Sequence, residues 1–361
     1  MKIYYFLTLV SFLLISCSNE KKQDDLLEIP IDAHQNDLLL LSEIAEEITE
    51  IELELTDESI LSPDYINRII ISENEVFIEN MTKIYVFSRK GKFIRTIGSR
   101  GQGPGEYTYI TNMAMDEKNK RLFVISSPKI ICYDFYGKFL KEVILFSGAI
   151  HDINYINGEL LLLTNSNCYD SSEFDLCPTL YRLDDEFRIV DSCRIMSLYR
   201  PKSAARSSAD FILKNDKSVF LYYGDFSFIT NNNLREKILS DTLYLFKNNH
   251  IVPDLKLKFK NDGADKFIHL LNIYRSSRYI FALYFNYNFR QIRYHYCYDT
   301  KTKKGYNMQD GYTDDINGIE KLVQIRPINY DTEMFYYLHT KMKPDDLEEP
   351  NPTLYIGKLK K

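Results

Sequence analysis

Residues 97–107 (IGSRGQGPGEY) are the stretch best suited by composition to ligand chemistry, because four glycines and a proline stand between two apolar runs. A loop that cradles phosphate needs backbone N–H groups at the start of a helix, usually followed by Gly-Lys-Ser/Thr. Here Pro104 removes one donor, no Lys-Ser/Thr follows, and the next segment has the pattern of a strand. We therefore predict a joint between two pieces of scaffold, from which Arg100, Glu106 and Tyr107 could still project into a ligand site.

Histidines and carboxylates give no ready-made catalytic or metal pattern. The six histidines are scattered without ligand spacing, and there is no Gly-x-Ser-x-Gly or EF-hand sequence. His151 and Asp152 open a strand and could reach a central channel, although such a pair is more often a polar strand end. Residues 314–318 (DDING) fit a polar turn better than a cation site. We predict no metal and no cofactor, and catalytic residues stay unknown because carboxylate pairs for glycoside hydrolysis can be distant in sequence.

Two aromatic segments, residues 220–228 (FLYYGDFSF) and 279–290 (YIFALYFNYNFR), combine ring faces with polar groups. Alternate side chains of such strands pack in the core, and only the ends that run into loops can face a ligand. Aromatic faces beside Asn, Asp and Arg suit a sugar or a peptide. The candidate ligand-binding residues here are Tyr223, Asp225, Tyr287 and Arg290.

The N-terminus predicts export. An apolar run from Ile3 to Ile15 follows Lys2, and it is too short to span a bilayer but has the length of a signal-peptide core. Residues 14–17 (LISC) resemble the lipobox of bacterial lipoproteins, which implies cleavage after residue 16 and lipidation of Cys17; the alternative is an ordinary signal peptide. We thus expect a signal peptide at 1–16, a polar tether at 17–37, and a membrane anchor in the cell envelope, on the periplasmic or surface side of the outer membrane.

The remaining cysteines divide into two kinds. Cys168 and Cys177 share one long loop in an oxidising compartment, so they could form a disulfide or remain as two thiols. Cys132, Cys193 and Cys297 lie on strands and are expected to be small core residues.

The composition describes a globular β protein. The chain has 361 residues, 45% hydrophobic and 27% charged, with 28 Tyr, 22 Phe and no Trp. Abundant aromatic and β-branched residues favour sheet. A net charge of -6 argues against a nucleic-acid partner, which needs a basic face.

An internal repeat sets the architecture. Residues 83–94 (KIYVFSRKGKFI) and 129–140 (KIICYDFYGKFL) each read as a strand, a tight turn and a second strand, with glycines 46 residues apart. Weaker echoes give six equivalent points, spaced by 46, 50, 62, 53 and 57 residues: Phe87, Tyr133, Leu183, Leu245, Tyr298 and Tyr355. About fifty residues per unit predicts an all-β, six-bladed β-propeller of four-stranded antiparallel blades over residues 38–361.

The last unit runs out of chain after three strands, and the N-terminus supplies a candidate fourth. Residues 50–55 (EIELEL) alternate, with Ile51, Leu53 and Leu55 on one face. We predict that this strand completes the last blade and closes the ring.

Four segments carry a family resemblance: residues 41–48 (LSEIAEEI), the turn at 91–95 (GKFIR), the loop at 101–107 (GQGPGEY) and residues 314–318. Together they resemble the six-bladed β-propeller lipoproteins of Gram-negative gut-type bacteria, which are related in shape to NHL-repeat propellers. The resemblance implies fold and location, and the family has no established activity to transfer.

Loop lengths indicate which face could bind. The connections between second and third strands, and those between successive blades, are long, whereas the other turns are short, and function concentrates on long loops over a rigid scaffold. We predict a non-catalytic binding scaffold for a glycan, a peptide or a partner protein on this long-loop face. The alternative is a propeller hydrolase or lyase that acts on a polysaccharide or peptide at the channel mouth. Convergence of Arg100, Glu106, His151 and Asp152 in one pocket would favour the alternative.

Overall fold

The structure of the chain is a computed structural model. It describes residues 26–145, 149–167, 175–196, 198–199, 205–206, 210–224, 226–229, 235–238, 240–260, 268–287, 292–329, 331–342 and 349–361.

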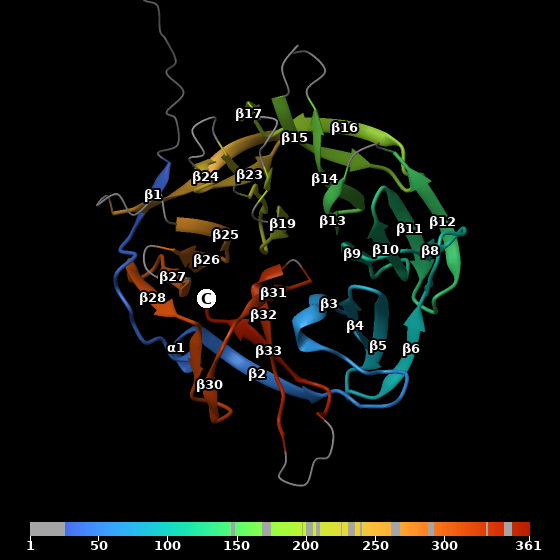
Figure 1. Ribbon diagram of the computed structural model, residues 1–361, viewed down its shortest axis with the longest axis horizontal. Helices are drawn as coiled ribbons and strands as arrows, with labels where there is room; N and C mark the ends of the chain where they lie inside the picture. The colour runs from blue at the N-terminus through green and yellow to red at the C-terminus, as the bar shows by residue number, and fades with distance from the viewer. Residues whose placement is uncertain are drawn as a thin grey trace, which may run out of the picture.

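The chain folds into antiparallel four-stranded sheets arranged like the blades of a propeller around a common centre (Figure 1). The first sheet contains β3 (Ile66–Ile71), β4 (Glu75–Asn80), β5 (Lys83–Ser88) and β6 (Phe93–Ile97). The second contains β9 (Asn112–Asp116), β10 (Arg121–Ser126), β11 (Lys129–Asp134) and β12 (Phe139–Ile144). The third contains β13 (Ile150–Ile156), β14 (Glu159–Asn167), β15 (Asp175–Leu183) and β16 (Ile189–Arg194), with β17 (Leu198–Tyr199) also paired to β15. The fourth contains β25 (Ile268–Arg275), β26 (Tyr279–Asn286), β27 (Ile292–Asp299) and β28 (Lys304–Gln309).

A nine-stranded sheet joins two further runs of strands. One run is β19 (Phe211–Lys214), β20 (Val219–Tyr222), β23 (Thr242–Lys247) and β24 (His250–Phe259). The other is β31 (Arg326–Ile328), β32 (Asp331–His339), β33 (Thr353–Leu359) and β2 (Ala45–Glu52). The link between the runs is a single parallel pair, Lys214 with Asp331.

Short elements fill the connections. They are β7 (Ser99–Arg100) with β8 (Glu106–Tyr107), β18 (Ala205–Arg206) with β21 (Phe226–Ile229) and β22 (Arg235–Ile238), β29 (Tyr312–Asp314) with β30 (Ile319–Val323), the 3-10 turn η1 (Pro63–Tyr65) and the helix α1 (Leu41–Ile44). Among the described residues, no helix has the length and apolar character needed to cross a bilayer.

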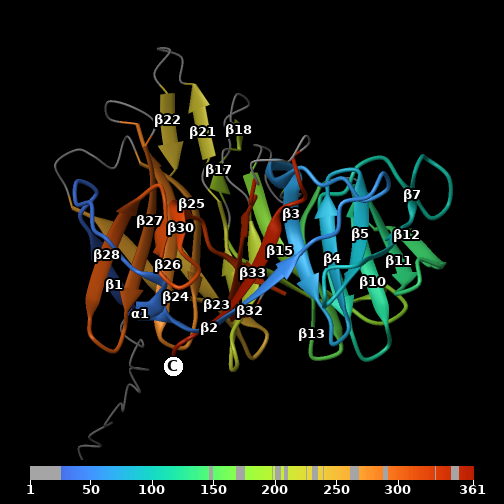
Figure 2. The same cartoon turned by 90° about the horizontal axis from the view of Figure 1, so that it is seen from below.

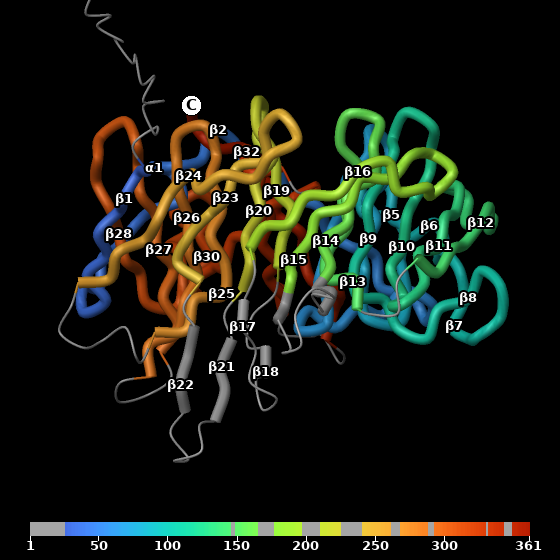
Figure 3. The backbone as a smooth tube through the Cα atoms, turned by 90° about the horizontal axis from the view of Figure 1, so that it is seen from above, coloured from blue at the N-terminus to red at the C-terminus, as the bar shows by residue number. Residues whose placement is uncertain are grey.

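The N-terminal segment wraps around the outside of three groups of strands (Figures 1 and 3). It begins with β1 (Leu27–Ile31), which pairs in parallel with β24 because Ile29 and Ile31 are buried there. The tether predicted for residues 17–37 is therefore wrong from residue 27 onward, since alternation of Ile29 and Ile31 makes an edge strand. Asp37 then forms two hydrogen bonds with Asn307 of β28, each 2.8 Å long. The N–H of Asp37 donates to the backbone carbonyl of Asn307, and the N–H of Asn307 donates to the carboxylate of Asp37.

The strand β2 pairs antiparallel with β33 from Ala45↔Leu359 to Glu52↔Thr353. It thus lies beside the last strand of the chain, as predicted, but it begins and ends earlier than residues 50–55. Ile51 and Leu53 are buried on one face, whereas Leu55 lies beyond the strand and is 39% exposed. Because β2 ends at Glu52, the predicted strand extends three residues too far.

Hydrophobic side chains pack between neighbouring sheets. One cluster joins Phe77 and Val86 of the first sheet to Leu122 and Val124 of the second, all fully buried. This packing explains why the strands carry apolar residues on both faces, since each sheet is covered by a neighbour on either side.

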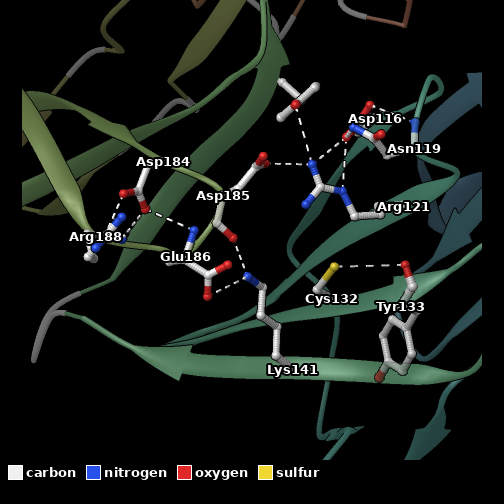
Figure 4. A network of polar contacts seen from close by, with 11 residues as sticks. Asp116, Asn119, Arg121, Cys132, Tyr133, Lys141, Asp184, Asp185, Glu186 and Arg188 are labelled. Carbon is white, nitrogen blue, oxygen red and sulfur yellow. Dashed lines mark hydrogen bonds and ion pairs between the residues drawn. The ribbon is translucent and has the colours of Figure 1, made fainter.

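Polar contacts fasten the second sheet to the third (Figure 4). The guanidinium of Arg121 lies 2.5 Å from Asp116 in its own sheet and 2.6 Å from Asp185 in the turn between β15 and β16. Lys141 donates to the backbone carbonyl of Asp185, and its ammonium lies over the ring of Phe187, 4.7 Å from the centroid. These polar contacts join the two sheets at the turns, beyond the apolar core.

Candidate functional site

The glycine-rich stretch is a structural joint from β6 to β9, at the rim of the molecule beside β12 (Figures 1 and 3). Within it, β7 and β8 pair in parallel, and the Glu106 carboxylate accepts from the backbone N–H of Gly103 at 2.8 Å. Tyr107 is buried and donates its hydroxyl proton to the carbonyl of Ile97 at 2.8 Å, whereas Arg100 is exposed. Glu106 and Tyr107 are thus engaged in holding the loop.

Side chains of the second sheet also bind the joint. Tyr133 donates to the carbonyl of Gly105 at 2.7 Å, Lys129 donates to the carbonyl of Gly103 at 3.1 Å, and Glu142 accepts from the N–H of Gly105 at 3.0 Å. The N–H groups of Gly103 and Gly105, which could otherwise bind a phosphate, are thus occupied by two carboxylates of the protein.

Asp152 is enclosed by other protein groups and is not exposed to solvent. It is fully buried, and its carboxylate lies 3.1 Å from the guanidinium of Arg68, accepts from the amide of Asn112, and accepts from the N–H of Ile212 at 2.6 Å. Burial raises the pKa of Asp152 to about 6, although the Arg68 charge opposes that shift. His151 is partly buried beside it on β13.

The four residues proposed as a catalytic constellation are not brought together. No hydrogen bond or ion pair joins Arg100 or Glu106 to His151 or Asp152. Figure 1 shows the reason, because β8 lies at the rim while β13 lies nearer the centre, and Figure 2 shows β7 at the outer edge as well. The convergence that would have favoured an enzyme is absent among these described residues.

The aromatic candidates have different positions. Tyr223 is fully buried, so its ring belongs to the core. Tyr287 is 45% exposed and packs against Phe285 and His269, with ring centroids 5.9 and 6.4 Å away. Asp225 and Arg290 lie outside the described residues.

Of the cysteines, Cys17 and Cys168 lie outside the described residues. Cys177 is buried and disulfide-bonded, and its pairing with Cys168 stays a prediction. Cys132 and Cys297 are buried free thiols on strands, as expected, while Cys193 is partly exposed. Within the described part of the chain, no cluster of three His, Cys, Asp or Glu side chains could hold a metal ion.

A cavity of about 370 Å³ lies near the centre, where β3, β25, β26, β27 and β31 meet. Its walls include five Tyr and Phe rings, those of Phe211, Tyr274, Phe281, Tyr312 and Tyr336. Its polar lining includes Arg68, Asn272, Arg293, His295, Gln324 and Arg326. This volume and this mixture are typical of a small-molecule site.

A second cavity of about 570 Å³, the outer cavity, borders the first, the inner cavity, because Arg293, Gln324, Arg326 and Tyr336 line both. Its other lining residues are Pro63, Asp64, Lys321, Leu322, Val323, Tyr337, Leu338, His339, Thr340 and Glu349. Pro63 and Asp64 lie in the connection before β3, and Thr340 and Glu349 lie in the connection between β32 and β33, whereas the other six lie on β30 and β32. Part of the lining of the outer cavity thus comes from connections between strands, and a binding role for the long-loop face stays a prediction.

Arg293 and Arg326 lie at the border that the two cavities share, which we call the passage. Arg293 donates to the side-chain carbonyl of Gln324 at 2.8 Å and lies over the ring of Phe285, 5.3 Å from its centroid. Arg326 donates to the backbone carbonyl of Ile66 at 3.1 Å. Among the described residues, no carboxylate lies within 4.0 Å of either guanidinium. Arg68, deeper in the cavity, differs because Asp152 balances its charge.

His295 lies in the wall of the inner cavity and is only 5% exposed. Its ring is edge-on to Tyr312 at 5.8 Å, and its Nε2 has no hydrogen-bond partner within the described structure. Burial, reinforced by Arg293 and Arg326, lowers the pKa of His295 to about 3, so the imidazole is neutral near pH 7. Asn272 likewise lines the cavity with a buried side-chain carbonyl that has no partner among those residues.

These cavity residues were not singled out from the sequence. One signal was available, since Arg293 and His295 are two apart in a strand and so share a face. The remaining members are spread along the sequence from Asn67 to Tyr336, and only the folded arrangement of the sheets brings them together.

The comparisons with known proteins concern fold and family. A family model described as "Domain of unknown function (DUF4934)" matches residues 26–360. No curated protein matches the chain. A Bacteroides fragilis protein described as a "Putative exported protein" is similar in structure, with a TM-score of 0.61 and 19% identity over 93% of this chain and 100% of that one. Weaker similarity links it to hydrazine synthase of Kuenenia stuttgartiensis (TM-score 0.44, 13% identity, 79% and 77% covered) and to the Pan2 WD40 domain of Neurospora crassa (TM-score 0.40, 14% identity, 82% and 76% covered).

Proposed function

The chain belongs to the DUF4934 family, whose description names no activity, and from that premise we propose that it is a non-catalytic binding module of the cell envelope. Its ligand enters through the outer cavity and is held in the inner one. The observation that carries this proposal is the inner cavity itself, whose lining combines aromatic rings with His295 and Asn272. Each of these two residues has a buried polar atom without a partner in the described structure, His295 Nε2 and Asn272 Oδ1. A buried polar atom without a partner costs free energy, and a ligand that supplies the partner recovers it.

Binding is favoured over catalysis by the arrangement of the charged side chains. The residues that could have formed a catalytic group are dispersed, with Glu106 held in the rim joint and Asp152 engaged by Arg68, Asn112 and Ile212. The concave cavity also favours a glycan unit or a chain end over a flat protein surface.

The proposed envelope location rests on the sequence and on one relative. Cys17 follows the lipobox-like residues 14–16, and the similar Bacteroides fragilis protein is described as exported. The tether would meet the fold at β1, which runs parallel to the outer strand β24 and so points toward the long-loop face. The chain thus reaches β1 from the opposite side, which would leave the cavity mouth facing away from the membrane.

We further propose that the ring has six blades, with the nine-stranded sheet counted as two. Supporting this count, the only backbone strand pairing between the described residues of the two runs is Lys214–Asp331. The pairing of β2 with β33 would then close the ring. Deletion of residues 45–55 should expose the β33 edge and give an insoluble protein; a soluble deletion variant that unfolds cooperatively would refute closure.

The binding proposal is tested with the full-length chain in detergent on glycan and peptide arrays. Gln324→Trp fills the passage between the cavities and should abolish binding, because Gln324 lines both. Val252→Trp, on the exposed surface of β24, is the matched control and should bind normally. Binding that survives Gln324→Trp would place the site elsewhere, and turnover of an arrayed compound would show that the protein is an enzyme.

A further inference from the structure

The passage between the two cavities carries positive charge that the protein leaves unbalanced. Arg293 and Arg326 both line it, and neither has a carboxylate within 4.0 Å among the described residues. Most other described arginines that point away from open solvent have such a partner, as Arg95 has Glu75 at 2.8 Å and Arg278 has Asp299 at 2.7 Å. Asp64 and Glu349 line the outer cavity, yet they pair with neither guanidinium.

The two guanidiniums are held in fixed positions by groups that do not neutralise them. The Phe285 ring and the Gln324 side-chain carbonyl orient Arg293, and the carbonyl of Ile66 orients Arg326. A guanidinium held in this way still has N–H groups for a planar anion, and its fork matches the two oxygens of a carboxylate. The passage is therefore suited to an anionic group of the ligand.

The inner cavity offers partners for hydroxyl groups. A neutral imidazole has one nitrogen that donates and one that accepts, so the Nε2 of His295 can bind a hydroxyl in either sense. The buried side-chain carbonyl of Asn272 accepts a hydroxyl proton. The rings of Tyr274, Phe281, Tyr312 and Tyr336 give apolar walls for the C–H faces of a saturated ring.

We infer that the ligand is an acidic sugar, whose carboxylate binds Arg293 and Arg326 while its hydroxyl groups bind His295 and Asn272. This inference rests on the proposed function and names the ligand class of the same site. An acidic peptide shares the carboxylate but does not present several hydroxyl groups on one compact ring, which is why the inner cavity favours a sugar.

The test is calorimetric titration of the full-length chain in detergent with glucuronic acid, galacturonic acid and their trisaccharides, and with the corresponding neutral sugars. The uronates should bind and the neutral sugars should bind far more weakly.

Arg293→Met and Arg326→Met should each weaken uronate binding by about tenfold or more, because each removes a charged hydrogen bond. Arg293→Lys should restore part of the loss. Arg188→Met is the control, since it removes the same charge from an exposed side chain outside the cavities. Thermal melting checks that each variant folds.

The outcomes separate this inference from the proposed function. Equal binding of neutral and acidic sugars, or uronate binding that survives both methionine variants, would overturn the acidic ligand while leaving the cavity as the site if Gln324→Trp still abolishes binding. Binding of a glutamate-rich peptide with no uronate binding would overturn the sugar. Binding that Gln324→Trp does not affect would overturn the proposed site, and the inference with it.

Discussion

The guanidinium of Arg68 lies 3.1 Å from the carboxylate of Asp152, and this pair joins the inner strands β3 and β13 of two different sheets. The same carboxylate also binds Asn112 on β9 and the backbone of Ile212 on β19. Four inner strands therefore meet at one buried acidic side chain. The residue that the sequence offered as a ligand-binding candidate is a hub that holds the centre of the molecule together.

Replacing Asp152 by Asn should lower the free energy of unfolding by about 3–5 kcal/mol, because the change keeps the shape but removes the buried negative charge beside Arg68. Urea unfolding measures the loss. Asp185→Asn is the control, since that carboxylate is largely exposed and its pairing with Arg121 should contribute no more than about 1 kcal/mol. Similar losses in the two variants would show that Asp152 is not a hub.

Glu79 should make stability depend on pH. Its side chain is fully buried, and Oε1 accepts from Asn67 and from the N–H of Met81, both at 3.1 Å. Burial raises its pKa to about 7, above the value of about 4.3 in an unfolded chain. The contribution of Glu79 to stability is thus full below about pH 4.3 and is lost as pH rises through about 7.

Glu79→Gln stays neutral at every pH, so it isolates this effect. Its free energy of unfolding, relative to the wild-type chain, should increase between about pH 5 and about pH 8. Urea unfolding of both proteins across that range gives the difference directly. A difference that stays constant with pH would contradict the raised pKa.

Asn329 should contribute to the seam between β31 and β3. Its side-chain amide accepts from the N–H of Ile71 at 2.6 Å and donates to the carbonyl of Ile71 at 2.7 Å. Its φ of 52° lies in the left-handed region, which Asn and Gly tolerate best. Asn329→Gly keeps that backbone and removes both hydrogen bonds, so it should cost about 1–3 kcal/mol.

Asn329→Ala adds the left-handed strain to the same loss and should be worse by about 1 kcal/mol. Thermal melting of the two variants separates the hydrogen bonds from the backbone. Equal stability of Asn329→Gly and the wild type would mean that the two hydrogen bonds do not hold the seam.

The repeat could be predicted from the sequence because the same local hydrogen bonds recur in the first three sheets, at the turn between the third and fourth strands. Asp134 and Asp184 each accept two backbone N–H groups at 2.8–2.9 Å, and Ser88 does so at 3.1 and 3.3 Å through its hydroxyl. Sequence comparison pointed to the glycine that follows, yet the third repeat has Phe187 there with a φ of 61°. The side chain that closes the turn is the more constant feature, and its local hydrogen bonds are what a sequence pattern can report.

The residues that line the cavities could not be predicted from the sequence in the same way. Asn67, Asn272 and Arg326 belong to different sheets, and nothing in their local patterns distinguishes them from ordinary polar strand ends. Asp152 had the right composition for a ligand site but lies opposite Arg68, a residue 84 positions earlier. Contacts between residues so far apart in the sequence depend on how the sheets are arranged in space, and a local sequence pattern does not reveal that arrangement.

Gly91 and Gly158 should differ sharply in their tolerance of a side chain, although both have left-handed backbones, with φ of 81° and 87°. A Cβ at Gly91 would lie 1.8 Å from the carbonyl oxygen of Glu52 at the end of β2, whereas a Cβ at Gly158 would meet nothing within 4 Å.

Gly158→Ala should therefore cost only the left-handed strain, about 1–2 kcal/mol. Gly91→Ala should cost more, because the turn must move away from β2 and the hydrogen bond from the N–H of Glu54 to the Gly91 carbonyl, 2.9 Å long, must stretch. Urea unfolding of the two variants gives the comparison, and proteolysis near residue 52 should quicken only in Gly91→Ala. If the two variants were equally stable, the close approach of this turn to β2 would be wrong, and with it the pairing that places the N-terminal strand against the last strand of the chain.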